Sequence, residues 1–175
     1  MQLILETLWF ILPAYAANAS PLYSTKIPVI KKFNQPMDFG INFAGNRLLG
    51  DGKTWAGFMV GILTSLTTAF TLNLINLLLP LNLPQHTLLL GFLLGFGAMS
   101  GDAFGSFIKR RTGFERGAPA LFLDQLDFLA GALLITLPLH PLNLPQISVA
   151  VLLTPPIHGL TNRIAWLIKL KKHPW

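Results

Sequence analysis

The sequence predicts an all-α membrane protein, a single integral membrane domain (residues 1–175) with about five transmembrane helices. Composition is the first reason, because 52% of the residues are hydrophobic and only 11% are charged, whereas roughly a quarter of a soluble domain is charged. The second reason is that residues 54–101 and 128–162 contain no Asp, Glu, Lys or Arg. A membrane-spanning helix needs about 20 residues, so each stretch is long enough to cross the bilayer and start back.

The apolar pattern places the five spans at about residues 2–17, 54–79, 87–108, 118–138 and 147–168. Proline-rich breaks at 79–84 and 140–145 divide the two uncharged stretches, because proline cannot continue a helix. The first span differs from a cleaved signal peptide, since residues 1–18 contain no Lys or Arg and Glu6 lies inside the apolar segment. We expect it to remain in the mature protein.

The 13 basic residues fall in three segments, 26–53, 109–116 and 163–172. With five crossings these segments share one side of the membrane, which the positive-inside rule makes cytoplasmic. The sequence therefore predicts a multi-pass protein of the cell membrane, with its N-terminus outside and its C-terminus in the cytoplasm. Topology accounts for the net charge of +6, and no aromatic array accompanies it, so nucleic acid is not an expected partner. The absence of cysteine excludes disulfides and cysteine-based sites.

Three acids, Asp102, Asp124 and Asp127, lie in the predicted spans, where charge is costly and usually marks a site. Asp124 and Asp127 share a helix face, and the hairpin around residues 109–117 brings that face near Asp102. Convergent carboxylates predict a Mg2+ site, because Mg2+ prefers oxygen ligands and takes one or two carboxylates plus substrate phosphates. The alternative is that each acid pairs with a basic residue of the loop: Lys109, Arg110, Arg111 or Arg116.

The third span also carries a polar strip. Asp102, Ser106 and Lys109 are spaced four and three residues apart and line one helix face, with Arg110 one step around. Arg binds phosphate bidentately and Lys binds it as a point charge, so this strip predicts phosphate binding. Glycines recur every four residues in the third span and the second: Gly97, Gly101 and Gly105, and Gly57 and Gly61. We interpret them as sites of close helix packing rather than as ligands.

The loop before the second span is rich in glycine, with Gly45-Asn46-Arg47 followed by Gly50-Asp51-Gly52-Lys53-Thr54. It looks like a phosphate-binding P-loop, but Arg47 stands where that motif needs glycine and a membrane helix follows instead of a βα unit. It still suits an anion, because glycines let backbone amides approach, Lys53 adds charge and Thr54 opens a helix. A turn followed by a juxtamembrane lysine is an equally good interpretation.

Three further polar residues are candidates. His158 and Asn162 lie four residues apart in the fifth span, next to Arg163, and Asn18 precedes Pro21 at the end of the first span. For these residues a hydrogen bond between helices competes with a ligand role, and for His158 it is the favoured interpretation. The sequence contains no Ser-His-Asp arrangement and no histidine pair at zinc spacing.

Four motifs in order give the chain a specific resemblance to the archaeal CDP-archaeol synthases. They are LPAYAANAS at 12–20, GDGKTW at 50–55, GDAFGSFIKRR at 101–111 and DQLDF at 124–128, and the resemblance extends to HGLTN at 158–162. The related CDP-diacylglycerol synthases have a Ser-x-x-Lys-Arg element followed by paired aspartates. Here Asp-Gln-Leu-Asp replaces their Asp-Arg-x-Asp, and their preceding His-Gly-Gly is missing, which favours the archaeal ether-lipid branch.

The resemblance implies a Mg2+-dependent cytidylyltransferase of phospholipid biosynthesis. Such an enzyme joins CTP to an isoprenoid diether glycerol phosphate of the lipid bilayer, 2,3-bis-O-geranylgeranyl-sn-glycerol 1-phosphate, and gives CDP-archaeol and pyrophosphate. We expect Asp102, Asp124 and Asp127 to hold Mg2+ and to act in catalysis with Lys109. The residues expected to bind CTP or phosphate are Asn18, Asn46, Arg47, Gly50, Asp51, Gly52, Lys53, Thr54, Ser106, Lys109, Arg110, His158 and Asn162.

Two alternatives are a CDP-diacylglycerol synthase acting on ester lipids and a small ion or proton transporter that uses the intramembrane acids. A transporter should place ionisable groups near the middle of the membrane, whereas these acids cluster near the predicted cytoplasmic edge.

For the lipid substrate, apolar grooves between the spans would take the two isoprenoid chains. The sequence carries no indication of an oligomeric state.

Overall fold

The computed structural model describes residues 1–24, 27–115, 117–171 and 173–174, which are mostly helical, as the sequence predicts. Lys26, Arg116 and Lys172, which entered the charge pattern above, lie outside the described residues. The elements in chain order are α1 (Gln2–Ala19), α2 (Pro21–Ser24), α3 (Pro28–Lys32), β1 (Asn42–Phe43), β2 (Asn46–Arg47), α4 (Trp55–Leu78), α5 (Leu88–Arg111), α6 (Leu123–Thr136) and α7 (Leu144–Leu167).

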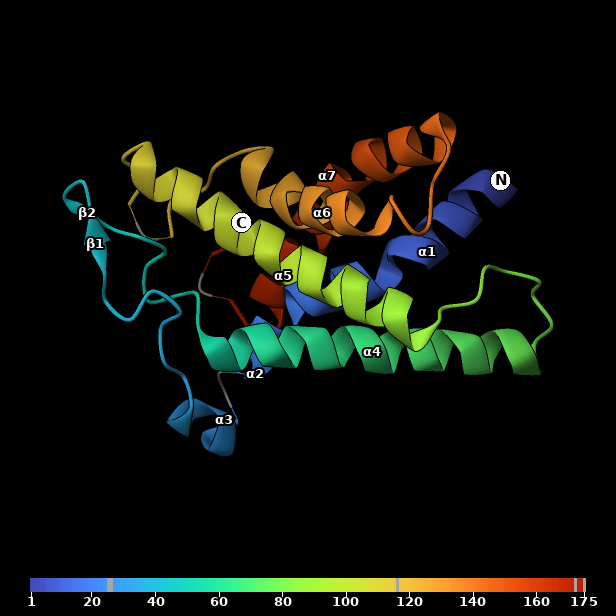
Figure 1. Cartoon of the computed structure of the whole chain (residues 1–175), viewed down its shortest axis with the longest axis horizontal. Coiled ribbons are helices and arrows are strands. Elements are labelled where there is room, and N and C mark those ends of the chain that lie inside the picture. Colours follow the sequence, from blue (N-terminus) through green and yellow to red (C-terminus); the bar gives the residue numbers. More distant parts are fainter. Residues whose placement is uncertain (25–26, 116, 172, 175) are drawn as a thin grey trace.

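Helix α5 is the central element (Figure 1). It packs against α4, α6 and α1, and α7 completes the bundle by packing against α1 and α6. The core between these helices includes Ile11, Leu94, Phe128 and Ala132, all with 0% of their surface exposed. The short β1–β2 hairpin lies at the end of the molecule opposite the N-terminus.

Helices occupy all five predicted span positions, but in the described residues two of them, α4 and α5, are long and apolar enough to cross a membrane. Each has 24 residues, or about 36 Å at 1.5 Å per residue, against a hydrocarbon core of about 30 Å. Helix α6 has 14 residues and starts at Leu123, later than the predicted 118, because Phe122 adopts a φ of 64°, outside the right-handed helical region. Five crossings and the orientation of the termini stay predictions.

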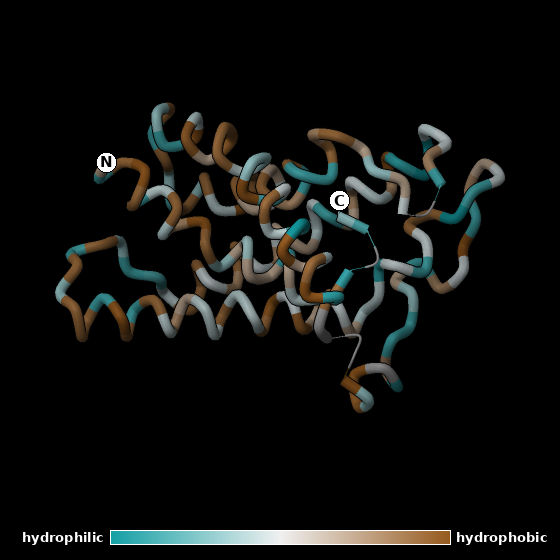
Figure 2. The backbone as a smooth tube through the Cα atoms, turned by 180° about the vertical axis from the view of Figure 1, so that it is seen from behind, coloured by the Kyte–Doolittle hydropathy of each residue, from teal (hydrophilic) through white to brown (hydrophobic). Residues whose placement is uncertain are grey.

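The outer faces of the helices are apolar. Phe70, Leu77, Leu134 and Leu152 are between 65% and 77% exposed, and exposed apolar surface of this extent marks contact with lipid or with a partner. Figure 2 shows hydrophobic residues along the helices and hydrophilic ones gathered around the C-terminus and the loop that carries the hairpin. The polar residues predicted for the site therefore concentrate at one end of the molecule.

Polar side chains fix where the long helices start and how α4 turns into α5. Thr54, Thr87 and Asn143 cap α4, α5 and α7, and Asn143 forms a capping box. In the turn after α4, the Asn73 amide donates to the His86 carbonyl at 2.5 Å and accepts from the His86 N–H at 2.8 Å. The predicted proline-rich break is thus a turn tied to the preceding helix.

Glycines bring α5 and α6 into backbone contact. A Cβ on Gly101 would overlap the carbonyl of Asp127, and a Cβ on Gly131 would overlap the carbonyl of Gly97. A Cβ on Gly105 would overlap the Asp127 carboxylate. The glycines of α4 also meet side chains closely: Gly57 meets Thr54, and Gly61 meets Met99. The interpretation of the repeated glycines as packing sites is confirmed for α5 and for Gly61, because larger residues there would hold the helices apart.

Replacing Gly101 by valine should destabilise the fold. The new side chain would collide with backbone, which cannot move aside, and overpacking of this kind costs about 1–3 kcal/mol or more. The measurement is the Tm of the detergent-solubilised protein, which should fall. Gly159→Ala is the matched control, because a Cβ at Gly159 meets nothing within 4 Å and alanine favours helix. Equal stability of the two variants would contradict the close approach of α5 and α6.

Candidate active site

The polar end of the molecule contains a cavity of about 1210 Å³. Its wall comes from α1, α2, the loop before α4 and the start of α4, the C-terminal half of α5, the start of α6, α7 and the segment after α7. The predicted site residues on this wall are Asn18, Arg47, Gly50, Asp51, Gly52, Lys53, Thr54, Asp102, Ser106, Lys109, Arg110, Asp124, His158 and Asn162. Asn46 and Asp127 do not line it. The fold therefore brings most of the candidates together, and their roles in binding stay predictions.

The loop before α4 is organised around one buried carboxylate. Asp38 is 2% exposed and accepts hydrogen bonds from the Arg47 guanidinium (2.6 Å from Nη2) and from the amides of Leu49 and Gly50 (3.0 and 2.8 Å). The Arg47 contact is the main cause that holds the pKa of Asp38 well below its usual range, and the amides add to it. Arg47 also lies 2.7 Å from Asp51, so one guanidinium fastens both sides of the glycine turn.

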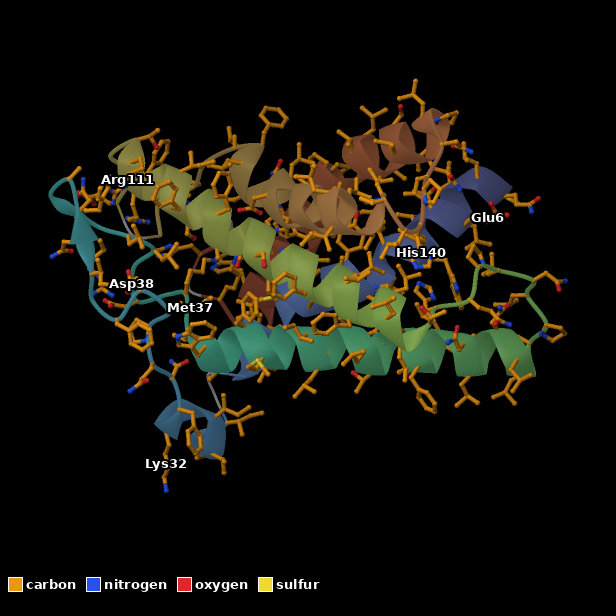
Figure 3. All side chains as sticks on the ribbon, viewed as in Figure 1. Glu6, Lys32, Met37, Asp38, Arg111 and His140 are labelled. Atoms are coloured by element: carbon orange, nitrogen blue, oxygen red, sulfur yellow. The ribbon has the colours of Figure 1, made fainter. Side chains whose placement is uncertain are left out.

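A second clamp holds the β1–β2 hairpin to the end of α5 (Figure 3). The Arg111 guanidinium donates to the backbone carbonyls of Phe43, Asn46 (3.1 Å) and Arg47 (2.8 Å). It also lies over the rings of Phe43 and Phe107, 5.3 and 5.4 Å from their centroids. Arg111 thus binds carbonyl groups, whereas the sequence had raised it as a partner for an acid. Asn46 takes part through its carbonyl, and its side chain is exposed outside the cavity.

Two ion pairs between lysine and aspartate lie on the cavity wall. Lys53 Nζ is 2.5 Å from Asp102 Oδ2, which joins the glycine loop to α5. Lys109 Nζ is 2.8 and 2.9 Å from the two Asp124 oxygens and donates to the Ala118 carbonyl at 2.6 Å. The alternative in which the acids form ion pairs therefore holds for Asp124, while the partner of Asp102 is a lysine 49 residues away. Each pair joins a residue predicted to bind Mg2+ to one predicted to bind phosphate.

Arg110 and Ser106 complete the polar strip of α5 on the cavity wall. The Arg110 guanidinium donates to the carbonyls of Phe114 (2.6 Å) and Glu115 (3.3 Å), so it also holds the chain that follows α5. Ser106 is half-buried. Both residues are placed for contact with a ligand, but Arg110 would offer only part of its guanidinium.

The start of α4 is less available to an anion than the sequence suggests. Thr54 is 7% exposed, and its hydroxyl accepts a hydrogen bond from the Gly57 N–H at 3.1 Å. The Trp55 N–H donates to the Gln35 carbonyl at 3.0 Å. Part of the helix N-terminus is thus satisfied within the chain, although Thr54 lines the cavity together with Gly50 to Lys53.

Asp127 lies behind the cavity wall, between α5 and α6. Its carboxyl group packs against Gly105 and accepts the Phe128 N–H at 2.6 Å. Within the part of the chain that the structure describes, no three Asp, Glu or His side chains converge on one metal position. The expected three-carboxylate centre is not preformed, because two of the carboxylates turn to lysines and the third to the glycine stripe.

The donor set on the wall nevertheless fits Mg2+. Asp102 and Asp124 both line the cavity, and their side chains are 20% and 34% exposed. Mg2+ takes its ligands from oxygen, keeps several waters and needs only one or two protein carboxylates beside substrate phosphates. These two aspartates are therefore the residues that would hold the ion, with Asp127 behind the wall.

Another part of the wall is built from α1 and α7. Tyr15 Oη lies 2.7 Å from Thr154 Oγ1, which joins the two helices. Asn162 Nδ2 lies 3.2 Å from His158 Nδ1, and Asn162 Oδ1 accepts a hydrogen bond from Lys171 Nζ at 2.9 Å. The hydrogen bond expected between helices for His158 thus lies within α7. Both α7 side chains still line the cavity.

Three residues that organise the site were not among the sequence candidates: Asp38, Arg111 and Lys171. Arg111 was considered only as an ion-pair partner for an acid, Lys171 only as part of the basic pattern that predicts topology, and Asp38 was given no role. Their partners are backbone groups, the Arg47 guanidinium and the Asn162 amide, and hydropathy and helical spacing do not reveal such contacts. An isolated acid in a glycine-rich loop was the one available signal, because such a residue commonly binds backbone amides.

Asp38→Asn should make the stability of the protein less sensitive to acid. An acid with a lowered pKa stabilises the fold above its unfolded value, ordinarily 3.8, and that stability is lost progressively as the pH falls from near this value toward the lower folded one. Between about pH 5 and pH 3, the Tm of the wild type should therefore fall more steeply than that of Asp38→Asn. Glu6→Gln, at the far end of α1, is the control. Parallel curves for the wild type and Asp38→Asn would contradict the assignment.

Three comparisons with known proteins agree with one another. A family profile described as "CarS-like: CDP-archaeol synthase" matches residues 1–175. A relative from Methanopyrus kandleri, named "CDP-archaeol synthase", is 45% identical over 172 residues, which cover 96% of this chain and 91% of that protein. A relative of the same name from Archaeoglobus fulgidus is 43% identical over 186 residues, which cover 100% of this chain and 99% of that protein. A solved structure of "an intramembrane enzyme for archaeal membrane lipids biosynthesis" has a TM-score of 0.72 and 36% identity, over 91% of this chain and 94% of that one.

Proposed function

The chain belongs to the CarS-like family of CDP-archaeol synthases, and we propose that it transfers the cytidylyl group of CTP to 2,3-bis-O-geranylgeranyl-sn-glycerol 1-phosphate. The products are CDP-archaeol and pyrophosphate. The chain is an enzyme of lipid biosynthesis, and the transporter alternative has no support. The observation that carries the proposal is a single cavity in which lysines and carboxylates lie beside apolar side chains. A nucleoside triphosphate and a lipid phosphate together require both the charged and the apolar groups.

The triphosphate suits the cationic part of the cavity. Lys53 and Lys109 offer point charges there, and Arg110 offers a planar donor. The clamp between Asp38 and Arg47 keeps the glycine loop in one conformation, so Lys53 is held in place before a ligand arrives. A loop that is already ordered has less conformational entropy to lose when the substrate binds.

The reaction is an in-line displacement at the α-phosphorus of CTP. An oxygen of the lipid phosphate forms the new P–O bond while the bond from the α-phosphorus to the bridging oxygen breaks, and pyrophosphate leaves with the electron pair. Lys53 and Lys109 orient the phosphates and offset their charge, which is most of what such a reaction needs from a protein. Mg2+, when bound, neutralises charge on the triphosphate and the departing pyrophosphate, and Asp102 and Asp124 are the residues that would hold it.

Both ion pairs must open for these residues to act as proposed. Asp102 cannot pair with Lys53 at 2.5 Å and ligate a cation through the same oxygen, and the pair of Lys109 with Asp124 poses the same choice. A cation that bound alone would take the carboxylates and leave the lysine ammonium groups without counter-ions. A triphosphate that bound alone would take the lysines and leave the carboxylates without counter-ions. Either state costs free energy at partly buried sites. Metal and nucleotide together supply new partners for all four groups, so they should bind cooperatively.

The chain is a membrane protein, and the lipid would reach the cavity from the bilayer with its phosphate at the cytoplasmic face, the side that the positive-inside rule assigns to the basic end. An apolar groove of about 580 Å³ adjoins the cavity. It is lined mainly by the aromatic rings Trp55, Phe58, Phe96, Phe104 and Phe107, and it shares Met37, Leu49, Phe58 and Ala103 with the cavity wall. An isoprenoid chain in this groove would need no polar contacts.

Pyrophosphate release by the purified protein tests the proposed function. We expect release, with cytidine incorporated into lipid, only when CTP, Mg2+ and the diether glycerol phosphate are all present. Ester-linked phosphatidic acid is the matched acceptor, and preferential turnover of it would assign the enzyme to the ester-lipid class. No release with either acceptor would contradict cytidylyl transfer.

Asp102→Asn and Asp124→Asn should each lower kcat/KM by about 100-fold or more. An amide is a weaker ligand for Mg2+ than a carboxylate, and the lysine partner also loses its counter-ion. Glu6→Gln is the control, because Glu6 lies at the end of the molecule away from the cavity (Figure 3). Thermal unfolding establishes that each variant is folded. A folded Asn variant with wild-type activity would remove that aspartate from the site.

A further inference from the structure

The chain that follows α7 turns back onto the cavity. Lys169 adopts a φ of 59°, and the N–H groups of Leu170 and Lys171 both donate to the Ala165 carbonyl, at 2.8 and 3.1 Å. This reversal is the usual way in which a residue of left-handed conformation ends a helix. Leu170, Lys171 and His173 consequently line the cavity, although no step of the reaction described above uses them.

Lys171 is held in a defined position on the wall. Its Nζ donates to Asn162 Oδ1 at 2.9 Å, and the Asn162 side chain is itself buried, at 8% exposure, and contacts His158. Burial lowers the pKa of the Lys171 ammonium, while the Asp124 carboxylate acts in the opposite direction. The amine is therefore partly withdrawn from water, and it lies close enough to Asp124 to interact with the charge of that carboxylate.

An ammonium in this setting is suited to an anion. Attraction between charges is stronger where water is partly excluded, and lysine binds phosphate as a point charge. The proposed substrates are a triphosphate and a phosphate monoester, which must lie side by side to react, and Lys53 and Lys109 approach the cavity from the loop and from α5. Lys171 brings a cation from a third direction, after α7.

We propose that Lys171 is a further phosphate-binding residue of the cavity, so that the C-terminal segment forms part of the substrate site. The inference rests on the proposed function, and it assigns Lys171 to a phosphate group, either of CTP or of the lipid. Asn162 is then a positioning residue, which aims the amine.

Kinetics with one substrate varied at a time test the proposal and identify the phosphate. Lys171→Gln should raise the KM for either CTP or the lipid phosphate by about tenfold or more, as expected for loss of a hydrogen bond to a charged group, with a smaller change in kcat. Lys171→Arg should recover most of the affinity. Lys169→Gln is the matched control, because it removes the same charge from an exposed residue off the cavity wall, and it should behave like the wild type.

Two results would overturn the proposal. One is a Lys171→Gln protein whose two KM values stay within twofold of the wild type or match those of Lys169→Gln. The other is a fall in kcat and Tm with both KM values unchanged and no rescue by arginine, which would mark a purely structural lysine. If the wild type releases no pyrophosphate, the proposed function itself fails. Equilibrium binding of CTP and of the lipid phosphate then tests the role of Lys171 separately. Equal affinities of the wild type and Lys171→Gln for both ligands would contradict that role.

Discussion

The close approach of α5 and α6 is the constraint on which the site depends. Glycines on both helices remove the side chains that would hold the two backbones apart. The approach brings Lys109, near the end of α5, within 2.8 Å of Asp124 at the start of α6. It also confines Asp127 to the helix contact, where its carboxylate meets Gly105, and leaves Asp102 to meet Lys53 from the glycine loop. A wider spacing would separate Lys109 from Asp124 and so break up the proposed site.

Charge is scarce in this chain, and the few charged groups around the cavity are largely matched to one another. Lys53 and Lys109 each have an aspartate, and Arg47 joins Asp38 to Asp51. Such matching is expected near a membrane, where an isolated charge is costly. The same pattern suits a magnesium nucleotide, which offers a cation to carboxylates and anions to lysines. One set of residues can therefore stabilise the fold and bind substrate, provided that the partners exchange.

The helical architecture and the gathering of the polar residues could be predicted from sequence, because both follow from local hydropathy and charge placement. The start of α6 could not be predicted. Residues 118–122 are uncharged, like the span that follows, and yet the φ of 64° at Phe122 prevents the helix from starting before Leu123. Helical spacing placed Asp127 on the same face as Asp124, but it carried no information on Gly105 of α5, against which Asp127 packs. The pairing of Lys53 with Asp102 joins residues 49 positions apart, and no local pattern reports such a contact.

If the two ion pairs exchange partners when substrates enter, CTP and Mg2+ must strengthen each other's binding by the same factor. The most direct measurement is the affinity of the purified wild-type protein for CTP, by equilibrium dialysis, at a series of Mg2+ concentrations. Exchange predicts that CTP binds about tenfold or more tightly at saturating Mg2+ than with the metal chelated. An affinity for CTP that is the same with and without Mg2+ would contradict the exchange of partners at Lys53 and Lys109.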